Sequence, residues 1–447
     1  MTDFAGLKLA SPILRAVTDE GYDTPTPIQA QSIDAIIDGH DLMGVAQTGT
    51  GKTAAFSLPL LHLLSDNEGR KAISCQPNAL ILAPTRELAG QIQDSLRLYG
   101  RHVPLRSMVV FGGVNIRPQI QALKRGAHIL VATPGRLIDL MNQGYCDLNK
   151  VEVFVLDEAD RMLDMGFIHD VRKVAEKLPR QHQTIMFSAT MPPKVKKLAD
   201  GLLDDPVHVS VAPAATTAEK VAQSVMFVPK DKKRVLLEKI MQDEAIKKVL
   251  IFTRTKHGAN RVAKQLVQKG VSADAIHGNK TQNARQKALK KFKNGEVRVL
   301  VATDIASRGI DVDGVTHVIN YELPNEPESY VHRIGRTARA GCEGIAISLC
   351  EMDERAYLRD IERAIRAKVP VDKEHPWHSE EISDHTGPAP KRSGGGGGGR
   401  GRGGHGGGNG GGGNRRRGQG GGNSGGGNGN PQKKRRNNTK RSRPRAA

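Results

Sequence analysis

A strand that ends in acidic residues is the clearest chemical signal in the sequence. Residues 151–160 read V-E-V-F-V-L-D-E-A-D, so an apolar, β-branched run leads directly into Asp157, Glu158 and Asp160. Parallel α/β sheets bind ligands at the carboxyl ends of their strands. Carboxylates at such a position can hold a magnesium ion and activate a water molecule. The segment therefore predicts a nucleoside triphosphate site.

A phosphate-binding loop lies about a hundred residues upstream, at Ala46–Thr53, which reads A-Q-T-G-T-G-K-T. It matches the pattern G-x-x-x-x-G-K-[ST] except that Ala46 replaces the first glycine. Gly49 and Gly51 permit the tight turn that directs backbone N–H groups at phosphate. We expect the loop to bind ATP through six consecutive residues: Thr48, Gly49, Thr50, Gly51, Lys52 and Thr53.

Each polar residue of the two segments has an expected role. Lys52 supplies a positive charge to the β- and γ-phosphates, and the Thr53 hydroxyl is a ligand that suits Mg²⁺. Asp157 is the expected magnesium partner, through water, because magnesium keeps much of its hydration. Glu158 is the expected base that orients the attacking water. Asp160 is expected to hold its loop through hydrogen bonds.

A proline-rich segment near the N-terminus predicts base recognition. Residues 21–29 read G-Y-D-T-P-T-P-I-Q. The amide of Gln29 can accept from adenine N6–H and donate to N7, which would select adenine over guanine. Tyr22 could stack on the base. A helix entry without a ligand role is the alternative interpretation of the same residues.

Composition limits the class of protein. The chain has 447 residues and a net charge of +20, and 15 of its Lys and Arg residues fall between Lys391 and Ala447, which contains no Asp or Glu. Such a charge predicts a polyanionic partner, and most of the excess positive charge lies on one tail. No apolar run is long enough for a membrane span, and the first residues lack a signal-peptide pattern. Four cysteines without C-x-x-C spacing indicate idle thiols in a reducing cytoplasm.

Strand and helix patterns alternate through most of the chain and predict an α/β protein with doubly wound parallel sheets. We expect a first domain over residues 1–210, a flexible linker over 211–219, and a second domain over 220–370. Residues 371–447 are expected to be a disordered basic tail, because Lys391–Ala447 holds 24 glycines and no aromatic residue. Trp377, the single tryptophan of the chain, lies near the start of this segment, and docking on the second domain and an idle position are both open.

In this order, the segments resemble the motifs of the DEAD-box RNA helicases of superfamily two. In the first domain they are Phe4 with Gly21–Gln29 (Q motif), Ala46–Thr53 (motif I), Pro84–Leu88 (motif Ia), Gly112–Gly113, Thr133–Arg136, Asp157–Asp160 (motif II) and Ser188–Thr190 (motif III). In the second they are Ile251–Arg254 (motif IV), Gln282 with Arg285, Val301–Asp311 (motif V) and His332–Arg339 (motif VI). The glycine-rich tail looks most like the bacterial RhlE-type subgroup.

The resemblance implies two RecA-like domains, with ATP and Mg²⁺ bound between them and single-stranded RNA on another face. Arg336 and Arg339 would reach the γ-phosphate as arginine fingers, and Asp311 would contact the ribose. His332 would couple motif VI to the acidic loop and to Ser188 and Thr190. The RNA backbone would be contacted by Arg86, Gly113, Thr133, Arg136 and Thr303. Ala338 stands where the strictest form of motif VI has glycine.

The expected activity is ATP-dependent, local and non-processive unwinding of RNA with remodelling of ribonucleoproteins, in the cytoplasm. The tail is expected to tether the enzyme to RNA, and ribosomal or RNA-decay proteins are its candidate protein partners. The principal alternative is a non-enzymatic RNA-binding or annealing protein that depends on the tail. A translocating DNA helicase and a P-loop ATPase with protein partners are further alternatives, which the Q motif and the second set of motifs disfavour.

Overall fold

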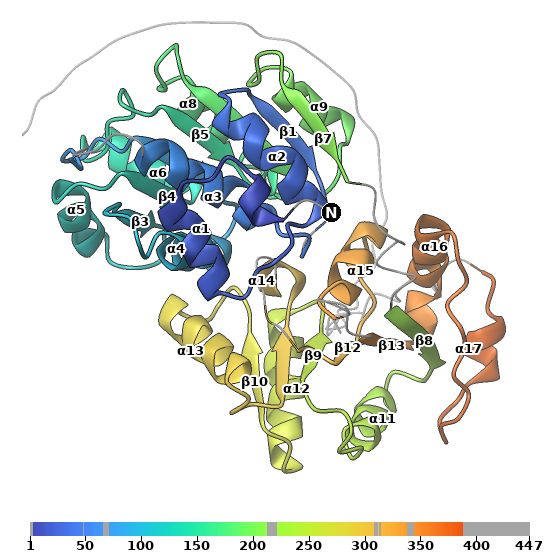
Figure 1. Ribbon diagram of the computed structural model, residues 1–447. Helices are drawn as coiled ribbons and strands as arrows, with labels where there is room; N and C mark the ends of the chain where they lie inside the picture. Colours follow the sequence, from blue (N-terminus) through green and yellow to red (C-terminus); the bar gives the residue numbers. More distant parts are fainter. Residues whose placement is uncertain are drawn as a thin grey trace, which may run out of the picture. The chain divides into compact units, whose positions relative to one another are not determined.

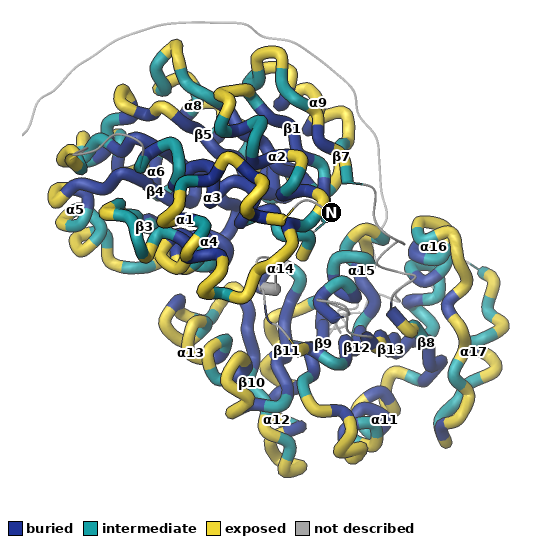
Figure 2. The backbone as a smooth tube through the Cα atoms, in the orientation of Figure 1, coloured by how far each residue is buried: buried dark blue, intermediate teal, exposed yellow. Residues whose placement is uncertain are grey.

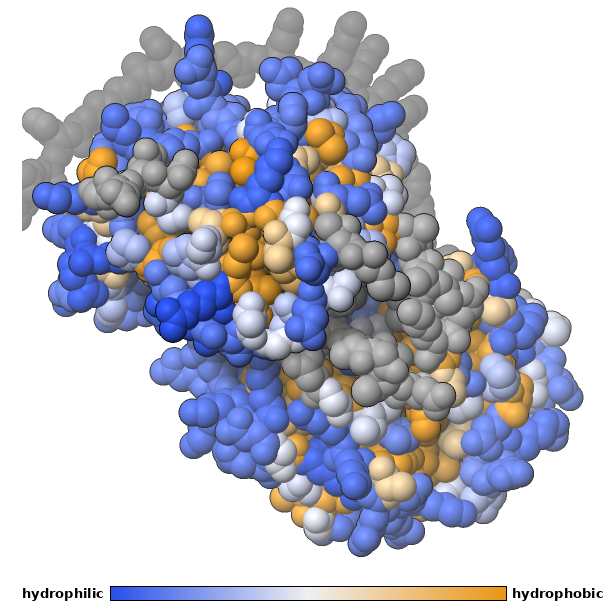
Figure 3. Space-filling model, in the orientation of Figure 1, coloured by the Kyte–Doolittle hydropathy of each residue, from blue (hydrophilic) through white to orange (hydrophobic). Residues whose placement is uncertain are grey.

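The computed structural model describes residues 3–47, 49–65, 71–211, 221–307, 312, 314–337 and 344–387. The chain divides into one compact unit, Met1–Lys391, and a second unit, Arg392–Ala447, which lies outside the described residues. The first unit contains two parallel sheets. Hydrophilic side chains cover much of the face that Figure 3 presents.

The first sheet is entirely parallel, and its strands within the described ranges follow the order β3-β4-β2-β5-β6-β1-β7. Figure 1 labels β3, β4, β5, β1 and β7 of this sheet. Its strands are β1 (Leu42–Val45), β2 (Ala79–Leu82), β3 (Ser107–Val110), β4 (Ile129–Ala132), β5 (Val153–Leu156), β6 (Gln183–Ser188) and β7 (Val207–Ser210). Every residue of β2, β4 and β5 is buried, as expected for parallel strands with helices on both faces.

Helices cover both faces of this sheet. One apolar cluster joins it to the helices α1 (Ser11–Asp19), α2 (Pro27–Ile37), α3 (Lys52–Ser65) and α4 (Arg86–Tyr99), and also includes Phe4 of η1 (Phe4–Gly6). A second cluster lies on the other face with α5 (Ile116–Lys124), α6 (Pro134–Asn142), α7 (Ala159–Asp164), α8 (Ile168–Ala175) and α9 (Pro193–Ala199). The strands are therefore the most deeply buried part of the domain, as Figure 2 shows.

The second sheet is also parallel, with the order β10-β11-β9-β12-β13-β8 over the residues that can be described. Its strands are β8 (Val221–Phe227), β9 (Val249–Phe252), β10 (Ala273–Ile276), β11 (Val299–Ala302), β12 (His317–Asn320) and β13 (Gly344–Cys350). The helices around it are α11 (Lys233–Ile240), α12 (Lys256–Gln268), α13 (Gln282–Lys293), α14 (Asp304–Ser307), α15 (Pro327–Ile334), η2 (Met352–Glu354), α16 (Arg355–Ile365) and α17 (Glu380–Asp384).

The two faces of the second sheet alternate residue by residue along each strand. Val249 and Ile251 of β9 pack with α11 and α12, whereas Leu250 and Phe252 pack toward α13. This period of two is the geometry of a strand that is covered on both sides. The predicted fold class, two doubly wound parallel-sheet domains, is confirmed.

Two helices begin at residues that belong to the predicted motifs. Thr85 caps α4 by accepting from Leu88 N, and α2 has a capping box between Thr26 and Gln29 with Pro27 at its first position. Apolar runs in the sequence predict nine of the strands, at residues 41–45, 79–82, 108–111, 128–131, 152–156, 184–187, 249–253, 297–302 and 317–321. The same patterns missed four described strands, namely β7, β8, β10 and β13. Three of these lie at sheet edges, where polar residues interrupt the apolar pattern, as Gln223 and Ser224 do in β8.

The folded unit extends beyond residue 370, where the sequence predicted its end. Val371 bridges to Val225 of edge strand β8, and Ser379 N donates to Phe227 O at 3.1 Å. Trp377 packs against the cluster around α11 and α12, and Ile382 is buried against β8. The tail thus begins later than residue 371, because these apolar side chains and backbone bonds order the segment. The expected linker, 211–219, lies outside the described residues except for Val211.

Candidate functional site

The strand order divides the carboxyl edge of the first sheet into two halves. The phosphate loop, Asp157 and Ser188 follow or end strands β1, β5 and β6, which are adjacent. Arg86, Gly113 and Thr133 follow β2, β3 and β4, which form the other half of the sheet. Residues predicted to bind nucleotide and residues predicted to bind RNA therefore lie along one edge, in two separate groups.

The phosphate loop has the backbone conformation that its glycines permit. Gly49 and Gly51 have φ values of 86° and 92°, in the region that L-residues rarely adopt. Lys52 begins helix α3, is 6% exposed, and donates from Nζ to Ala46 O at 2.6 Å. Burial lowers the pKa of Lys52, and the nearby carboxylates of Asp157 and Glu158 oppose that shift. Thr48 lies outside the described residues.

Gln29 is tied to the phosphate loop. Its Nε2 donates to Gly51 O at 3.2 Å, its Oε1 accepts from Thr26 N at 2.9 Å, and Thr26 Oγ1 donates to Thr50 O at 2.8 Å. A Cβ at position 51 would lie 2.4 Å from Gln29 Nε2, so only glycine permits this approach. An amide has two N–H groups and two acceptor lone pairs, so Gln29 keeps capacity for a ligand. Tyr22 is 40% exposed, and its ring lies 6.3 Å from that of Tyr99.

The three acids after β5 have different environments, although all are buried. Asp157 is 2% exposed and accepts from Glu158 N at 2.9 Å. Burial, with a further contribution from Glu158, raises the pKa of Asp157 to about 7, and Lys52 acts in the opposite direction. Glu158 accepts from Arg161 Nη1 at both carboxylate oxygens, at 2.8 and 2.7 Å.

Asp160 connects the acidic loop to the end of strand β6. Its Oδ2 accepts from Thr190 N at 2.9 Å, from Thr190 Oγ1 at 3.0 Å and from Ala189 N at 3.2 Å. Ser188 Oγ accepts from Asp160 N at 3.3 Å and donates to Thr190 O at 2.7 Å. The structure thus brings together the three residues that the sequence assigned to coupling.

The donor set around the phosphate loop fits a hydrated magnesium ion. Thr53 follows Lys52 on the first turn of α3, and Asp157 lies close enough to Lys52 to affect its pKa. A hydroxyl and a carboxylate are hard oxygen ligands, and magnesium needs few protein ligands because it keeps several waters. No cluster of three or more His, Cys, Asp and Glu residues that could hold a metal ion occurs in the described part of the chain.

The other half of the edge gathers basic groups around a glycine turn. Gly113 has a φ of 77°, and a Cβ built there would lie 2.1 Å from Arg86 Nη1. Arg136 Nη2 donates to Val114 O at 3.1 Å, and its buried Nη1 has no hydrogen-bond partner among the described residues. Thr133 precedes Pro134 at the start of α6. Helix N-termini and guanidinium groups both attract phosphate.

The second sheet carries its motif residues at the carboxyl ends of its strands as well. Thr303 follows β11 and is buried, and the adjacent Asp304 accepts from Arg333 Nε at 2.5 Å and from Arg333 Nη2 at 2.7 Å. Arg336 is 5% exposed and donates from Nε to His332 O at 3.2 Å. Burial first, then Arg161 and Arg336, lowers the pKa of His332 to about 4, so its ring is neutral at pH 7. Asp311 and Arg339 lie outside the described residues.

Three charged residues contact motif residues in the structure, although the predictions from sequence assigned them no role. Arg161 follows the acidic segment directly, Glu87 follows Arg86, and Arg333 follows His332. Glu87 accepts from Gln282 Nε2 at 2.9 Å and pairs with Arg285 at 3.1 Å. Arg333 is 2% exposed and lies over the Phe252 ring. Their position directly beside motif residues was the available sign in the sequence that they have a role. A charged residue at such a position is more often exposed to solvent, so this sign was weak.

Within the described residues, no helix combines the length and the apolar character that crossing a membrane requires.

Two family models match the chain. The DEAD/DEAH box helicase model matches residues 26–198, and the helicase conserved C-terminal domain model matches residues 231–341. The chain is 42% identical over 369 residues to the DEAD-box ATP-dependent RNA helicase CshA of Bacillus cereus, covering 83% of this chain and 69% of that protein. CshA of Bacillus subtilis is 42% identical over 373 residues, with 83% and 74% covered.

Solved structures with bound ligands are similar too. S. cerevisiae Dbp5 bound to RNA and ADP BeF3 matches with a TM-score of 0.73 and 29% identity, over 83% of this chain and 96% of that chain. Mss116p bound to ssRNA and AMP-PNP matches with a TM-score of 0.75 and 30% identity, over 85% and 81%.

Proposed function

Because the chain belongs to the DEAD-box family of ATP-dependent RNA helicases, we propose that it couples ATP hydrolysis to local, non-processive unwinding of RNA and to remodelling of ribonucleoproteins. The observation that supports this most is the division of one sheet edge into a phosphate half and a basic half. Nucleotide and RNA bound there would contact the same sheet. A change at one group of loops can then be transmitted to the other through β-strands that pair directly.

In the proposed mechanism, the loop from Gly49 to Thr53 binds the phosphates through backbone N–H groups, and Lys52 adds a positive charge. Thr53 and Asp157 would hold Mg²⁺, which neutralises phosphate charge when it is bound. Glu158 accepts a proton from the attacking water. Gln29 would select adenine with its remaining hydrogen-bond capacity, and Tyr22 would stack on the base.

The second domain would supply the groups that stabilise charge on the phosphates. Arg336, Arg339 and the ribose contact Asp311 are carried over from the family resemblance, as is the coupling role of His332. A guanidinium on a transferring phosphoryl group contributes about 10³–10⁵ in rate. A neutral His332 can both accept and donate a hydrogen bond, which suits a link between loops.

RNA would be held through its backbone by Arg86, Gly113, Thr133, Arg136 and Thr303. Contacts to phosphate carry no sequence information, so the core should tolerate any sequence. Contacts to 2′-hydroxyls would favour RNA over DNA. A strand held in a bent conformation does not fit a regular duplex, so base pairs would separate locally and the strand would be released after hydrolysis.

The test is steady-state ATP hydrolysis by the full chain with single-stranded RNA, with DNA of the same sequence, and without nucleic acid. We expect strong stimulation by RNA only, and loss of activity in Glu158→Gln with RNA binding retained. A variant as active as the wild type would overturn the role of Glu158. Activity indifferent to nucleic acid would favour the alternative, an RNA-binding or annealing protein that depends on its tail.

The tail, Lys391–Ala447, is proposed to raise RNA affinity by counterion release, which makes binding strongly salt-dependent. Deletion of residues 391–447 should flatten the dependence of RNA affinity on salt, and an unchanged slope would contradict tethering. Docking of ribosomal or RNA-decay proteins on the tail, a cytoplasmic location and membership of the RhlE-type subgroup are proposals of the same kind. The relatives compared above carry the name CshA instead.

A further inference from the structure

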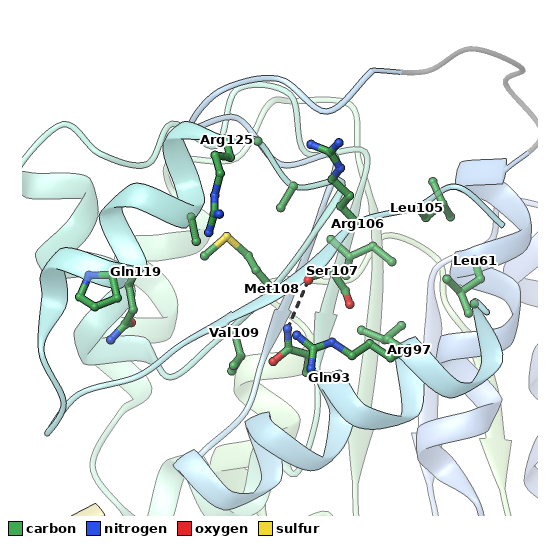
Figure 4. Close-up of a pocket in the computed structure, with 17 residues that line it drawn as sticks. Leu61, Gln93, Arg97, Leu105, Arg106, Ser107, Met108, Val109, Gln119 and Arg125 are labelled. Carbon is green, nitrogen blue, oxygen red and sulfur yellow. Dashed lines mark hydrogen bonds between the residues drawn. The ribbon is translucent and has the colours of Figure 1, made fainter. Parts of the chain in front are cut away.

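A groove runs along the open edge of the first sheet, outside the nucleotide and RNA residues. It has a volume of about 800 Å³ and is bounded by α4, strand β3 and α5 (Figure 4). Strand β3 pairs only with β4 among the described residues, so its other side faces this groove. An unpaired strand edge offers a row of backbone donors and acceptors to another extended chain.

The backbone of β3 shows which groups face outward. Arg106 O accepts from His128 N at 2.9 Å, and Val110 O accepts from Thr133 N at 3.1 Å. These residues therefore point toward β4, and because a strand alternates, Ser107 and Val109 point toward the groove. Gln93 Nε2 donates to Ser107 O at 3.2 Å, which is the dashed contact in Figure 4. The backbone groups of Val109 face the open edge of the strand.

The groove is basic and contains no acidic residue in its lining. Arg97 of α4 and Arg125 at the end of α5 extend toward the strand from either side, and Arg106 precedes β3 (Figure 4). All three are exposed, and none forms an ion pair with a described carboxylate. Arg101, four residues after Arg97, does pair with Glu20, which shows that the neighbouring surface has matched its charges.

The remaining lining favours a peptide over a nucleic acid. It includes Leu61, Leu105 and Met108 and no aromatic ring. Without aromatic side chains the groove cannot stack the bases of a single strand, so a nucleic acid would gain from it only phosphate contacts to the arginines. An extended peptide instead gains from main-chain pairing with a strand edge and from pockets for alternate side chains.

We propose that this groove binds an extended acidic segment of a partner protein, which adds a strand beside β3. The backbone of the partner would pair with Val109, and its carboxylates would contact Arg97, Arg106 and Arg125. The four residues of β3 span about 13 Å, so a short linear segment is sufficient. The helicase would in this way be recruited through a surface that leaves the nucleotide and RNA residues free.

The first experiment measures fluorescence anisotropy of a labelled peptide of alternating Val and Glu with the full chain. Because the basic tail also attracts acidic peptides, the same peptide N-methylated at alternate amides serves as the reference. We expect the unmodified peptide to bind at least about tenfold more tightly, and Arg97→Glu with Arg125→Glu to remove that advantage. Arg172→Glu with Lys173→Glu, at two exposed positions of α8, makes the same charge change and should preserve the advantage.

Hydrogen exchange gives a second measurement. The unmodified peptide should slow exchange at the Val109 amide in the wild type and not in the Arg97→Glu, Arg125→Glu variant. RNA-stimulated ATP hydrolysis by that variant should match the wild type. Equal binding of the two peptides would overturn the proposal. Loss of single-stranded RNA affinity in the double variant, without peptide dependence, would also overturn it and would assign the groove to nucleic acid.

Discussion

Arg161 donates through Nη1 to both carboxylate oxygens of Glu158, at 2.8 and 2.7 Å, and the two side chains are 2% and 5% exposed. Glu158 also has a φ of 53°, a left-handed conformation that costs a non-glycine residue about 1–2 kcal/mol. The ion pair offsets that cost and fixes the direction of the proposed base. Arg161 therefore acts on the reaction through Glu158, as a positioning residue.

Removal of Arg161 should destabilise the first domain through the charge that remains. We expect Arg161→Met to lower the free energy of unfolding by about 3–5 kcal/mol, because Glu158 would be buried without its partner. Urea denaturation measures the change. Glu158→Gln with Arg161→Met should recover much of the loss, since a neutral amide replaces the unpaired carboxylate. If the double variant is no more stable than Arg161→Met alone, the pair does not act as described.

Asp157 should make stability and ligand affinity respond to pH in opposite directions. Its pKa is about 7 in the folded protein and near 4 in the unfolded chain, so only the unfolded state ionises between these values. The wild-type protein therefore loses stability as the pH rises from about 4 to 7. The Asp157→Asn variant does not, because it has no carboxyl group at this position. We expect the variant to be more stable at pH 8 by on the order of 2 kcal/mol, and equal to the wild type below pH 4.

The ligand-free protein without Mg²⁺ is the sample for that denaturation series. The affinity of the wild type for ATP with Mg²⁺ should fall below pH 7, because the protonated carboxyl cannot support the metal. A variant that is less stable than the wild type at pH 8 would contradict the environment assigned to Asp157.

Gly113→Ala should weaken RNA binding without affecting nucleotide binding. The added methyl group would lie 2.1 Å from Arg86 Nη1 and would displace the guanidinium. We expect about a tenfold loss in affinity for single-stranded RNA, which is the size of one charged contact, and an unchanged ATP affinity. Gly166→Ala is the matched control, since Gly166 has a φ of 78° and nothing within 4 Å of a built Cβ. Equal effects of the two substitutions would point to backbone strain alone.

Ser188→Ala with Thr190→Ala should separate hydrolysis from unwinding. Both hydroxyls contact Asp160, and that of Ser188 also donates to Thr190 O, whereas neither contacts Lys52 or Glu158 in the contacts observed. We expect RNA-stimulated ATP hydrolysis within about threefold of the wild type, with strand separation largely lost, because a loop held by fewer hydrogen bonds transmits less of the change. The measurement is the number of duplexes separated per ATP hydrolysed. An unchanged ratio would remove these residues from coupling.

Much of the nucleotide site could be predicted because its determinants are local. A run of buried β-branched residues followed by Asp157, or by the loop before Lys52, defines a strand and the group at its end within about ten residues of sequence. The fold class followed from the same alternation of strand and helix. The order of motifs along the chain was sufficient to identify the family.

Contacts between distant segments could not be predicted in this way. Gly113 and Arg86 lie 27 positions apart, and only the placement of β2 and β3 in one half of the sheet brings them together. The docking of Trp377 needed a free strand edge at β8, and the basic groove needed a free edge at β3. Residue type and spacing determined which chemical groups lie at the end of each strand or the start of each helix. The hydrophobic period and the turn residues that define these elements act over short range. Strand order and edge exposure decided which of those groups meet, because they depend on how whole helices and strands pack.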